Sequence, residues 1–346
     1  MAHSMRIAVD AMGGDRGPAE VARGVYEAAL HSPSHFYLVG HPDVLQQELK
    51  KWHNHPKNLE IVPASEVIEM TDQPAVALRK KPDASVVVAA RMVHEGQADA
   101  FVTIGNTGAA MAVGLLTLGR IKGIDRPAIA TPLPSLTGGT VILLDAGATV
   151  DCDPNNLYEF ALMGSAYAEH VLGVPKPRVA LLSNGEEMNK GNTLVKRTHQ
   201  LLLSASQVEA PFEFVGNVEG RDLFKGLADV VICDGFTGNV LLKTAEGVAE
   251  MVLSLVKQEL GRHLWMRPLV APFMPAMRRL RTRIDYAERG GAPLLGVNGI
   301  CIIGHGRSTY YAVANACRAA EKAVEHNIVE VIRSRVCKAP LMPPAT

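Results

Sequence analysis

Short apolar segments alternate with helix-length amphipathic segments along most of this chain. The short segments are rich in β-branched residues and apolar on both faces, as buried parallel strands are. This alternation predicts a three-layer α/β/α fold, with a mostly parallel sheet, right-handed crossovers and helices on both sides. We predict strands at 6–9, 36–39, 59–62, 100–104, 141–144, 178–182, 212–215, 230–233 and 300–303, and helices at 18–30, 84–95, 156–171, 193–203, 240–260 and 309–326.

The domain organisation follows from length and composition. The chain has 346 residues, 47% of them hydrophobic, which provides for a sizeable core. We expect one two-lobed catalytic domain over 5–335, with the Pro- and Gly-rich stretch 132–139 as a loop that could join the lobes. Residues 1–4 resemble a tag remnant, and 336–346 is expected to be a loose tail.

Charge and cysteine content restrict the partners and the compartment. Lys plus Arg and Asp plus Glu both number 35, so no net charge draws the chain toward nucleic acid. The five cysteines include no C-x-x-C pair, which argues against a zinc ribbon or a disulfide framework. No uncharged apolar run approaches the ~20 residues that span a bilayer. These features predict a cytoplasmic protein.

Glycine-rich turns follow many of the predicted strands. Ligands of open parallel sheets gather at the carboxyl ends of the strands, where glycine allows close approach and a following helix offers free amide groups. None of these turns matches the phosphate-binding loop G-x-x-x-x-G-K-[ST], and none is a clean G-x-G-x-x-G after the first strand, so ATP and dinucleotide sites are disfavoured. The turns lie at 10–15, 105–108, 145–147, 183–191, 234–239 and 304–308.

The sequences of these turns resemble those of PlsX-type acyl-(acyl carrier protein):phosphate acyltransferases, from Met5 to about His326. The matching motifs are Asp10-Ala-Met-Gly-Gly-Asp15, Asn106-Thr-Gly-Ala, Leu144-Asp-Ala-Gly147, Leu182-Ser-Asn-Gly-Glu-Glu187, Gly216-Asn-Val-Glu-Gly220, Asp234-Gly-Phe-Thr-Gly-Asn239, Gly290-Gly-Ala-Pro-Leu-Leu-Gly296 and His305-Gly-Arg-Ser308. The turn at Asp145 departs slightly from the family's motif, so we assign no role to it from the sequence.

The resemblance implies a fold like that of phosphotransacetylases and isocitrate- or isopropylmalate-type dehydrogenases. It also implies a homodimer that makes acyl phosphate for bacterial phospholipid synthesis from an acyl-(acyl carrier protein) and inorganic phosphate. A downstream glycerol-3-phosphate acyltransferase becomes a possible partner. Phosphate is already ionised near neutral pH and a thiolate leaves readily, so we expect no cofactor, no metal and no covalent nucleophile. The site must hold two reactants and stabilise an oxyanion.

With this chemistry in view, Lys190 is the candidate that neutralises phosphate and the developing oxyanion. Asn239 would donate its side-chain amide to the thioester oxygen, beside the amides of Thr237 and Gly238. The plainer alternative for Lys190 is a solvated lysine at a helix start, and Asp10 could equally brace the Gly13-Gly14 turn. The further candidates for phosphate or substrate binding are Asp10, Gly13, Gly14, Asn106, Thr107, Gly108, Asn184, Gly185, Glu186 and Asp234.

Residues 261–285 form a segment that is both basic and apolar. Apolar bulk mixed with arginine suits the interface of an anionic membrane, so we predict peripheral association with the inner face of the cell membrane. Docking of the acidic carrier protein and contact with a second subunit are the alternatives. The residues proposed for this contact are Leu264, Trp265, Leu269, Phe273, Arg278 and Arg279.

Three other functions compete with this prediction. A phosphate acetyl- or butyryltransferase would use the same chemistry with acyl-coenzyme A as the donor. An NAD-dependent decarboxylating dehydrogenase shares the expected fold, but the sequence gives no clear paired-aspartate metal site or adenosine pocket. A non-catalytic sensor of phosphate or acyl groups would bind a ligand and release no thiol.

Overall fold

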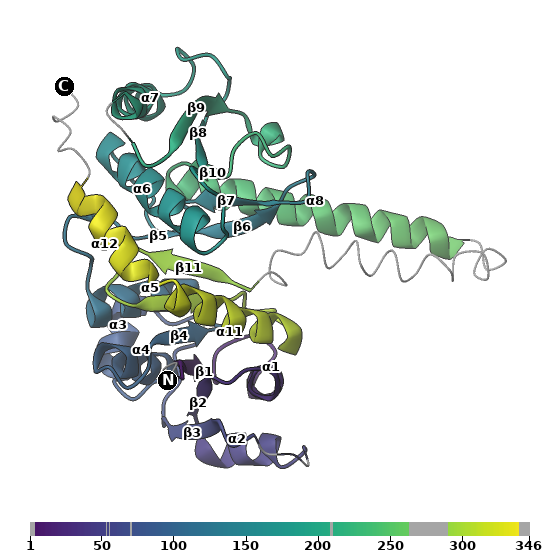
Figure 1. The fold of residues 1–346 in the computed structure, drawn as a ribbon. Coiled ribbons are helices and arrows are strands. Elements are labelled where there is room, and N and C mark those ends of the chain that lie inside the picture. Colours follow the sequence, from purple (N-terminus) through teal and green to yellow (C-terminus); the bar gives the residue numbers. More distant parts are fainter. Residues whose placement is uncertain are drawn as a thin grey trace.

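The computed structural model describes residues 4–52, 54, 56–69, 71–207, 210–262 and 290–338. These residues form two lobes, each built on its own sheet, with the helix α8 (Gly235–Arg262) projecting from the body (Figure 1). The α/β fold with mostly parallel strands is therefore confirmed, and the strands are divided between two sheets rather than joined in one.

The lower lobe in Figure 1 contains seven strands. Across its sheet they are β3 (Leu59–Pro63), β2 (His35–Gly40), β1 (Arg6–Asp10), β4 (Ala100–Thr103), β12 (Ile300–Ile303), β11 (Ala292–Leu295) and β5 (Ala128–Ile129). The first five run parallel, whereas β11 is antiparallel to both β12 and β5. The carboxyl ends of β1, β4 and β12 therefore meet at one edge.

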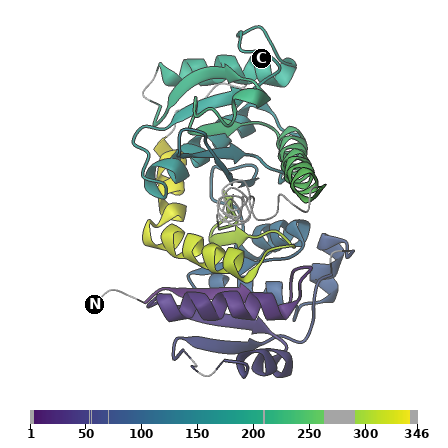
Figure 2. The same cartoon turned by 90° about the vertical axis from the view of Figure 1, so that its right-hand side faces the viewer.

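Helices cover both faces of this sheet. One face packs on α1 (Pro18–His31) and α11 (Tyr310–Glu325), which lie side by side (Figure 2). The other face packs on α4 (Ser85–His94) and α5 (Thr107–Val113). The smaller elements of the lobe are α2 (Pro42–Leu49), α3 (Pro74–Lys80) and the π-helical turn η1 (Gly114–Leu118).

The upper lobe contains five strands, with β10 at the centre of the sheet between β7 and β8. Across it they are β6 (Thr131–Pro134), β7 (Thr140–Leu144), β10 (Val230–Ile232), β8 (Arg178–Leu182) and β9 (Glu213–Val218). All neighbours are parallel except β6 and β7. The helices are α6 (Pro154–His170) and α7 (Thr193–Ser206) on one face, with α8 and the 3-10 turn η2 (Gly220–Asp222) on the other.

Local sequence explains where α6 begins. The Asp153 side chain accepts the amide of Asn156, and the Asn156 side chain accepts the amide of Asp153, so both form a reciprocal cap ahead of Pro154. At the far end of the chain, α12 (Ile328–Lys338) packs on α6, where Arg335 bonds to Glu169 and to Ser165. Arg333 of α12 also donates to Asn298, between β11 and β12, so α12 contacts both lobes.

The stretch 132–139 does not join the lobes as we predicted. Its first residues belong to β6, and Ser135 donates its amide to the Gly139 carbonyl in the turn that leads into β7. The chain crosses from the lower to the upper sheet at Ala130, between β5 and β6. We did not predict this strand because Pro132 and Pro134 argue against a strand in the sequence. The sheet tolerates both prolines because β6 is an edge strand.

The predicted strands and helices are found within a few residues of their expected positions, and four shorter helices were missed. These are α2, α3, α5 and α12. Helix α12 continues through 336–338, which we had assigned to the loose tail, and 339–346 lies outside the described residues. None of the described helices is both long and apolar enough to cross a bilayer.

Candidate active site

Two of the strand-end turns in the upper lobe open onto one cavity. The first, 183–192, follows β8, and the second, 233–237, follows β10 and starts α8. Asn184 and Gly191 from the first turn and Asp234 and Thr237 from the second line a cavity of about 580 Å³. The structure thus brings together two motifs that lie about fifty residues apart in the sequence.

Lys190 is exposed at the rim of the first turn, and its stem lies over Gly185. A Cβ atom added to Gly185 would lie 2.7 Å from Lys190 Cγ, so glycine makes room for the lysine stem. The turn is closed by Asn184 Oδ1, which accepts the Gly191 amide at 2.9 Å, and by the Lys190 amide, which donates to the Glu187 carbonyl. The backbone that carries Lys190 is therefore held by hydrogen bonds, while the residue itself is exposed.

Asn239 is exposed near the start of α8 and rests on the turn after β7. The position of a Cβ on Gly147 lies 3.4 Å from Asn239 Cγ, so the carboxamide packs directly on that glycine. Asp234 fixes the helix start because its carboxylate accepts the Thr237 amide at 2.8 Å and the Thr237 hydroxyl at 2.7 Å. This places the second candidate donor on a rigid helix start.

The Thr237 and Gly238 amides, which we predicted beside the Asn239 donor, form hydrogen bonds within the helix start, and their role toward the substrate stays a prediction. The Thr237 amide donates to the Asp234 carboxylate, and the Gly238 amide donates to the Asp234 carbonyl at 3.0 Å. Both amides therefore already have a hydrogen-bond acceptor in Asp234, the residue that caps the start of the helix. The side-chain amide of Asn239 stays our predicted donor from this turn.

Asp145 is a residue of this site that we did not single out from the sequence. Its wholly buried carboxylate accepts four backbone amides, those of Ile129, Gly147, Ala148 and Thr149, at 2.6–3.1 Å. Burial raises its pKa, and the amide hydrogen bonds oppose that rise. Asp145 therefore holds the turn on which Asn239 rests.

Glycine next to this turn lets α8 approach it. A Cβ on Gly238 would lie only 1.9 Å from the Asp145 carbonyl oxygen, and one on Gly235 would lie 2.5 Å from Asp145 Oδ2. The glycines of Asp234-Gly-Phe-Thr-Gly-Asn239 are thus required by close packing. The sequence showed the motif but not its partner, which is about ninety residues away.

The lower lobe assembles its own turns at the carboxyl edge of its sheet. A Cβ on Gly13 would lie 3.2 Å from the Cα atom of Gly105, and the Asp15 amide donates to the Gly306 carbonyl at 2.8 Å. Gly14 adopts a φ of 94°, a left-handed conformation that favours glycine. The turns after β1, β4 and β12 are thereby packed into one cluster.

Asp10 lies beneath this cluster and is almost fully buried. Its carboxylate accepts the Ser85 hydroxyl at 2.6 Å, the Thr103 hydroxyl at 2.7 Å and the Met12 amide at 3.2 Å. Burial raises its pKa, while the two hydroxyl groups oppose the shift. Of the two roles considered for Asp10, these contacts favour bracing the Gly13-Gly14 turn.

The remaining candidates of the lower lobe lie at the start of α5. Asn106 caps this helix, because its side chain accepts the Ala109 amide at 3.1 Å and donates to the Glu69 carbonyl at 3.4 Å. Thr107 and Gly108 form the first turn that follows this cap. Asn106 also borders a small pocket with Asp10 and Gly13, separate from the upper-lobe cavity.

Helix α8 connects the two clusters of turns. Lys243 Nζ lies 3.5 Å from His305 Nε2, and Arg307 lies 3.6 Å from Glu250, so α8 contacts the loop after β12. Burial and the nearby Lys243 lower the pKa of His305. The helix that starts at the upper-lobe site therefore also reaches the rim of the lower-lobe site.

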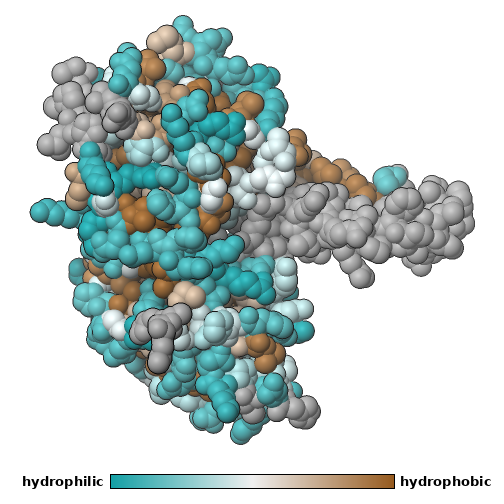
Figure 3. All heavy atoms as spheres, in the orientation of Figure 1, coloured by the Kyte–Doolittle hydropathy of each residue, from teal (hydrophilic) through white to brown (hydrophobic). Residues whose placement is uncertain are grey.

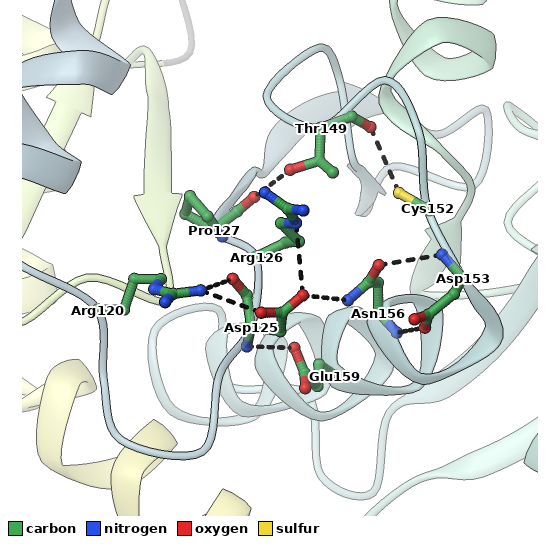
Figure 4. A network of polar contacts seen from close by, with 9 residues as sticks. All are labelled: Arg120, Asp125, Arg126, Pro127, Thr149, Cys152, Asp153, Asn156 and Glu159. Atoms are coloured by element: carbon green, nitrogen blue, oxygen red, sulfur yellow. Dashed lines mark hydrogen bonds and ion pairs between the residues drawn. The ribbon is translucent and has the colours of Figure 1, made fainter. Parts of the chain in front are cut away.

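A polar network fixes the chain just before it crosses between the lobes (Figure 4). The Asp125 amide donates to Glu159 at 2.9 Å, the Asp125 side chain accepts from Asn156, and Arg120 binds the Asp125 carboxylate. Burial raises the pKa of Glu159 to about 7. Both Glu159 and Asn156 belong to α6, so the crossing segment is anchored to the upper lobe.

The cysteines near the cavity are poor nucleophiles. Burial and the neighbouring Asp145 raise the pKa of Cys152 to about 12, and burial raises that of Cys233 well above its ordinary value. Both thiols are therefore protonated at neutral pH, and a thiol is much less nucleophilic than a thiolate. Among the residues that the structure describes, no group of three or more His, Cys, Asp or Glu side chains is placed to bind a metal ion.

The predicted membrane or carrier contact lies outside the described residues. This concerns Leu264, Trp265, Leu269, Phe273, Arg278 and Arg279, so their assignment stays a prediction.

Comparison with known proteins decides the family. The profile of the family described as "Fatty acid synthesis protein" matches residues 5–331. The phosphate acyltransferase of Heliobacterium modesticaldum is 52% identical over 335 residues, which cover 96% of this chain and 98% of the relative. The chain belongs to the phosphate acyltransferase (PlsX) family. The phosphate acyltransferase of a Cyanothece species, 49% identical over 95% of this chain and 94% of its own length, agrees.

Membership of the phosphate acyltransferase family also confirms the predicted class of enzyme, an acyltransferase. The fold is similar to that of solved phosphotransacetylases. A phosphotransacetylase from Streptococcus pyogenes has a TM-score of 0.65 at 15% identity, with 94% of this chain and 95% of that chain covered. A branched-chain phosphotransacylase from Enterococcus faecalis has a TM-score of 0.57 at 14% identity, with 93% and 99% covered. The predicted likeness to the phosphotransacetylase fold is thus confirmed.

Proposed function

We propose that this enzyme transfers a fatty acyl group from an acyl-(acyl carrier protein) thioester to inorganic phosphate, and so makes acyl phosphate for phospholipid synthesis. Family membership supports phosphate acyl transfer. The observation that carries the assignment of residues is that the turns bearing Lys190 and Asn239 converge on one cavity. Neither side chain lines the cavity itself, but each directly precedes a lining residue, Gly191 or Val240. A cationic donor and a neutral donor suit a reaction that develops negative charge.

The reaction needs no group beyond these donors and the two substrates. A phosphate oxygen attacks the thioester carbonyl carbon, and the carbonyl electron pair moves to oxygen as the new C–O bond forms. Lys190 neutralises phosphate and this oxyanion, and Asn239 donates its amide hydrogen to the same oxygen. The intermediate then collapses, the C–S bond breaks, and the thiolate takes a proton from solvent.

The donor thioester is tested by comparing two carriers for the same acyl group. Purified enzyme is given palmitoyl-(acyl carrier protein) or palmitoyl-coenzyme A, with and without phosphate, and free thiol is followed over time. Trapping with hydroxylamine identifies acyl phosphate as the product. We expect phosphate-dependent thiol release with a clear preference for the carrier protein.

Three other results would each point elsewhere. Equal or faster turnover with the coenzyme A thioester identifies a phosphate acetyl- or butyryltransferase type of enzyme. Ligand binding without thiol release identifies a sensor. Thiol release that is independent of phosphate contradicts the proposed acceptor.

We extend the proposal to a homodimer that forms through α8. Val248, Met251, Val252 and Leu255 are each 48–54% exposed, and hydrophobic side chains follow the projecting length of this helix (Figure 3). A long apolar face on a helix is typical of a partner interface. The test is sedimentation of the Val252→Glu variant, for which we expect a shift from dimer to monomer, whereas an unchanged dimer would exclude this face.

Residues 261–285 remain our proposed contact with the inner face of the cytoplasmic membrane, near a glycerol-3-phosphate acyltransferase that would consume the product. Vesicle sedimentation tests this contact, with Leu264, Trp265 and Phe273 replaced by polar residues. We expect binding to anionic vesicles to be lost. Retained binding would assign the segment to the carrier protein or the second subunit instead.

A further inference from the structure

The cavity beside the two upper-lobe turns has an apolar wall. Leu181 and Leu182 at the end of β8, Leu194 and Val195 at the start of α7, and Val240 and Leu241 on α8 supply aliphatic side chains. The volume of about 580 Å³ lies within the range of ligand sites, ~300–1,000 Å³, which are mostly apolar with a few polar groups at defined places.

Several polar side chains of the cavity are engaged in their own turns, whereas Ser183 Oγ is buried without a hydrogen-bond partner. Asn184 accepts the Gly191 amide, Asn192 accepts the Val195 amide at 2.9 Å, and both oxygens of Asp234 accept from Thr237. A polar ligand would have to compete with these bonds, whereas a hydrocarbon needs none of them. Apolar side chains supply most of the lining and Ser183 adds only a single buried hydroxyl, so the lining suits an alkyl chain.

We propose that this cavity binds the alkyl chain of the acyl donor and that its aliphatic wall sets the chain-length preference of the enzyme. This inference rests on the proposed function and deepens it by assigning a site for the part of the substrate that does not react. Lys190 and Asn239 do not line the cavity themselves but directly precede the lining residues Gly191 and Val240 in the chain, so the proposal places the thioester carbonyl at that end while the alkyl chain extends along the wall.

Gly220 offers a way to shorten the cavity without disturbing the site. It lines the cavity, and a Cβ added there would meet only Leu241 Cδ1, at the ordinary contact distance of 3.4 Å. Its φ is not in the left-handed region, so a larger side chain is compatible with the backbone. Val240 also lines the cavity and is half exposed, so a larger side chain there enters the cavity from α8.

The experiment measures kcat/KM with butyryl, octanoyl and palmitoyl thioesters of the same carrier for the variants Gly220→Leu and Val240→Trp. Each methylene group that loses its contact should cost about fourfold. We therefore expect the ratio of palmitoyl to butyryl turnover to fall by about tenfold or more in both variants.

Matched controls place the same side chains elsewhere. Gly139 lies in the turn between β6 and β7, where a Cβ meets nothing within 4 Å, and Val44 lies on the surface of α2. Gly139→Leu and Val44→Trp should leave the chain-length profile unchanged. A second readout is calorimetry with a thioether analogue of palmitoyl-coenzyme A, whose binding should show a more negative heat-capacity change than the butyryl analogue, as burial of apolar surface requires.

An unchanged palmitoyl to butyryl ratio in both variants, or an equal loss with every donor, would overturn the assignment of the cavity. So would equal heat-capacity changes for the two analogues. The proposed function fails separately, because it requires the unaltered enzyme to release thiol in a phosphate-dependent manner with at least one donor.

Discussion

The two lobes carry glycine-rich turns at the carboxyl edges of their sheets, but they use them differently. In the lower lobe the turns pack on one another, with Gly13 against Gly105 and the Asp15 amide on the Gly306 carbonyl. In the upper lobe the turns stand apart around a cavity of about 580 Å³ and support the exposed side chains of Lys190 and Asn239. The lower-lobe edge presents closely packed backbone, whereas the upper-lobe edge presents the exposed side chains of Lys190 and Asn239.

This difference separates two uses of glycine that look alike in a sequence. Gly13 and Gly14 allow backbone to meet backbone, whereas Gly185 and Gly147 make room for a neighbouring side chain. The two catalytic candidates, Lys190 and Asn239, are found where a glycine makes room for a neighbouring side chain. We therefore propose that acyl transfer takes place at the upper-lobe edge and that the packed lower-lobe edge has a supporting role.

The largest expected effect is on turnover at the upper edge. Lys190→Ala and Asn239→Ala should each lower kcat by about 10²–10³-fold, since each removes a donor to the developing oxyanion. Lys196→Ala, at an exposed lysine on α7, is the matched control and should retain normal turnover. Steady-state kinetics of folded variants checks this, and near-normal rates for both site variants would remove the distinction between the edges.

The two buried aspartates, Asp10 and Asp145, allow the two lobe edges to be compared directly, because each lies at the end of a strand and holds the turn that follows it. Asp10→Ala and Asp145→Ala should each lower the free energy of unfolding by about 1–3 kcal/mol, since each leaves buried donors without a partner. Only Asp145→Ala should also lower kcat strongly, because it releases the turn on which Asn239 rests. Urea unfolding and kinetics separate the two effects, and an equal loss of kcat in both would contradict the division of roles.

Two glycines of α8 test whether close packing at the upper edge is required. Gly238→Ala places a methyl group 1.9 Å from the Asp145 carbonyl and should destabilise the protein by about 1–3 kcal/mol. Gly247→Ala, on the same helix with nothing within 4 Å, should stabilise it by roughly 0.5–1 kcal/mol through helix propensity. Thermal unfolding measures both, and shifts of the same sign would show that the contact with Asp145 is unimportant.

The smallest expected effect concerns pH and the anchored crossing segment. Burial raises the pKa of Glu159 from 4.5 to about 7, so between these values the folded state binds more protons than the unfolded state. The free energy of unfolding should therefore fall as the pH rises through this window. Glu159→Gln should flatten that decline, whereas Glu95→Gln, at an exposed site after α4, should leave the decline as it is.

Much of the fold was accessible from the sequence because buried parallel strands are apolar on both faces. The strands around Val9, Val102 and Leu181 follow this pattern, and the structure places them near their predicted positions. Strand β6 was missed because Pro132 and Pro134 interrupt the pattern, and the two-residue β5 is too short to show one. Local composition could not reveal pairings that tertiary contacts decide.

The candidate site was accessible only in part. The motifs around Lys190 and Asn239 are local in sequence and were recognised, and the structure shows that their turns share a cavity. Asp145 was not assigned because its four partners and the glycines above it come from three separate segments. The apolar wall was not predicted either, since the leucines and valines that form it are typical of any core.

The most direct test of the account is a crystal structure of the enzyme with inorganic phosphate bound. We predict that phosphate contacts Lys190 Nζ close to the Asn239 carboxamide, between the turns that start at Ser183 and Asp234 and facing the lower-lobe turn that starts at Gly105. Phosphate bound elsewhere, with Lys190 and Asn239 directed to different surfaces, would contradict the proposed site.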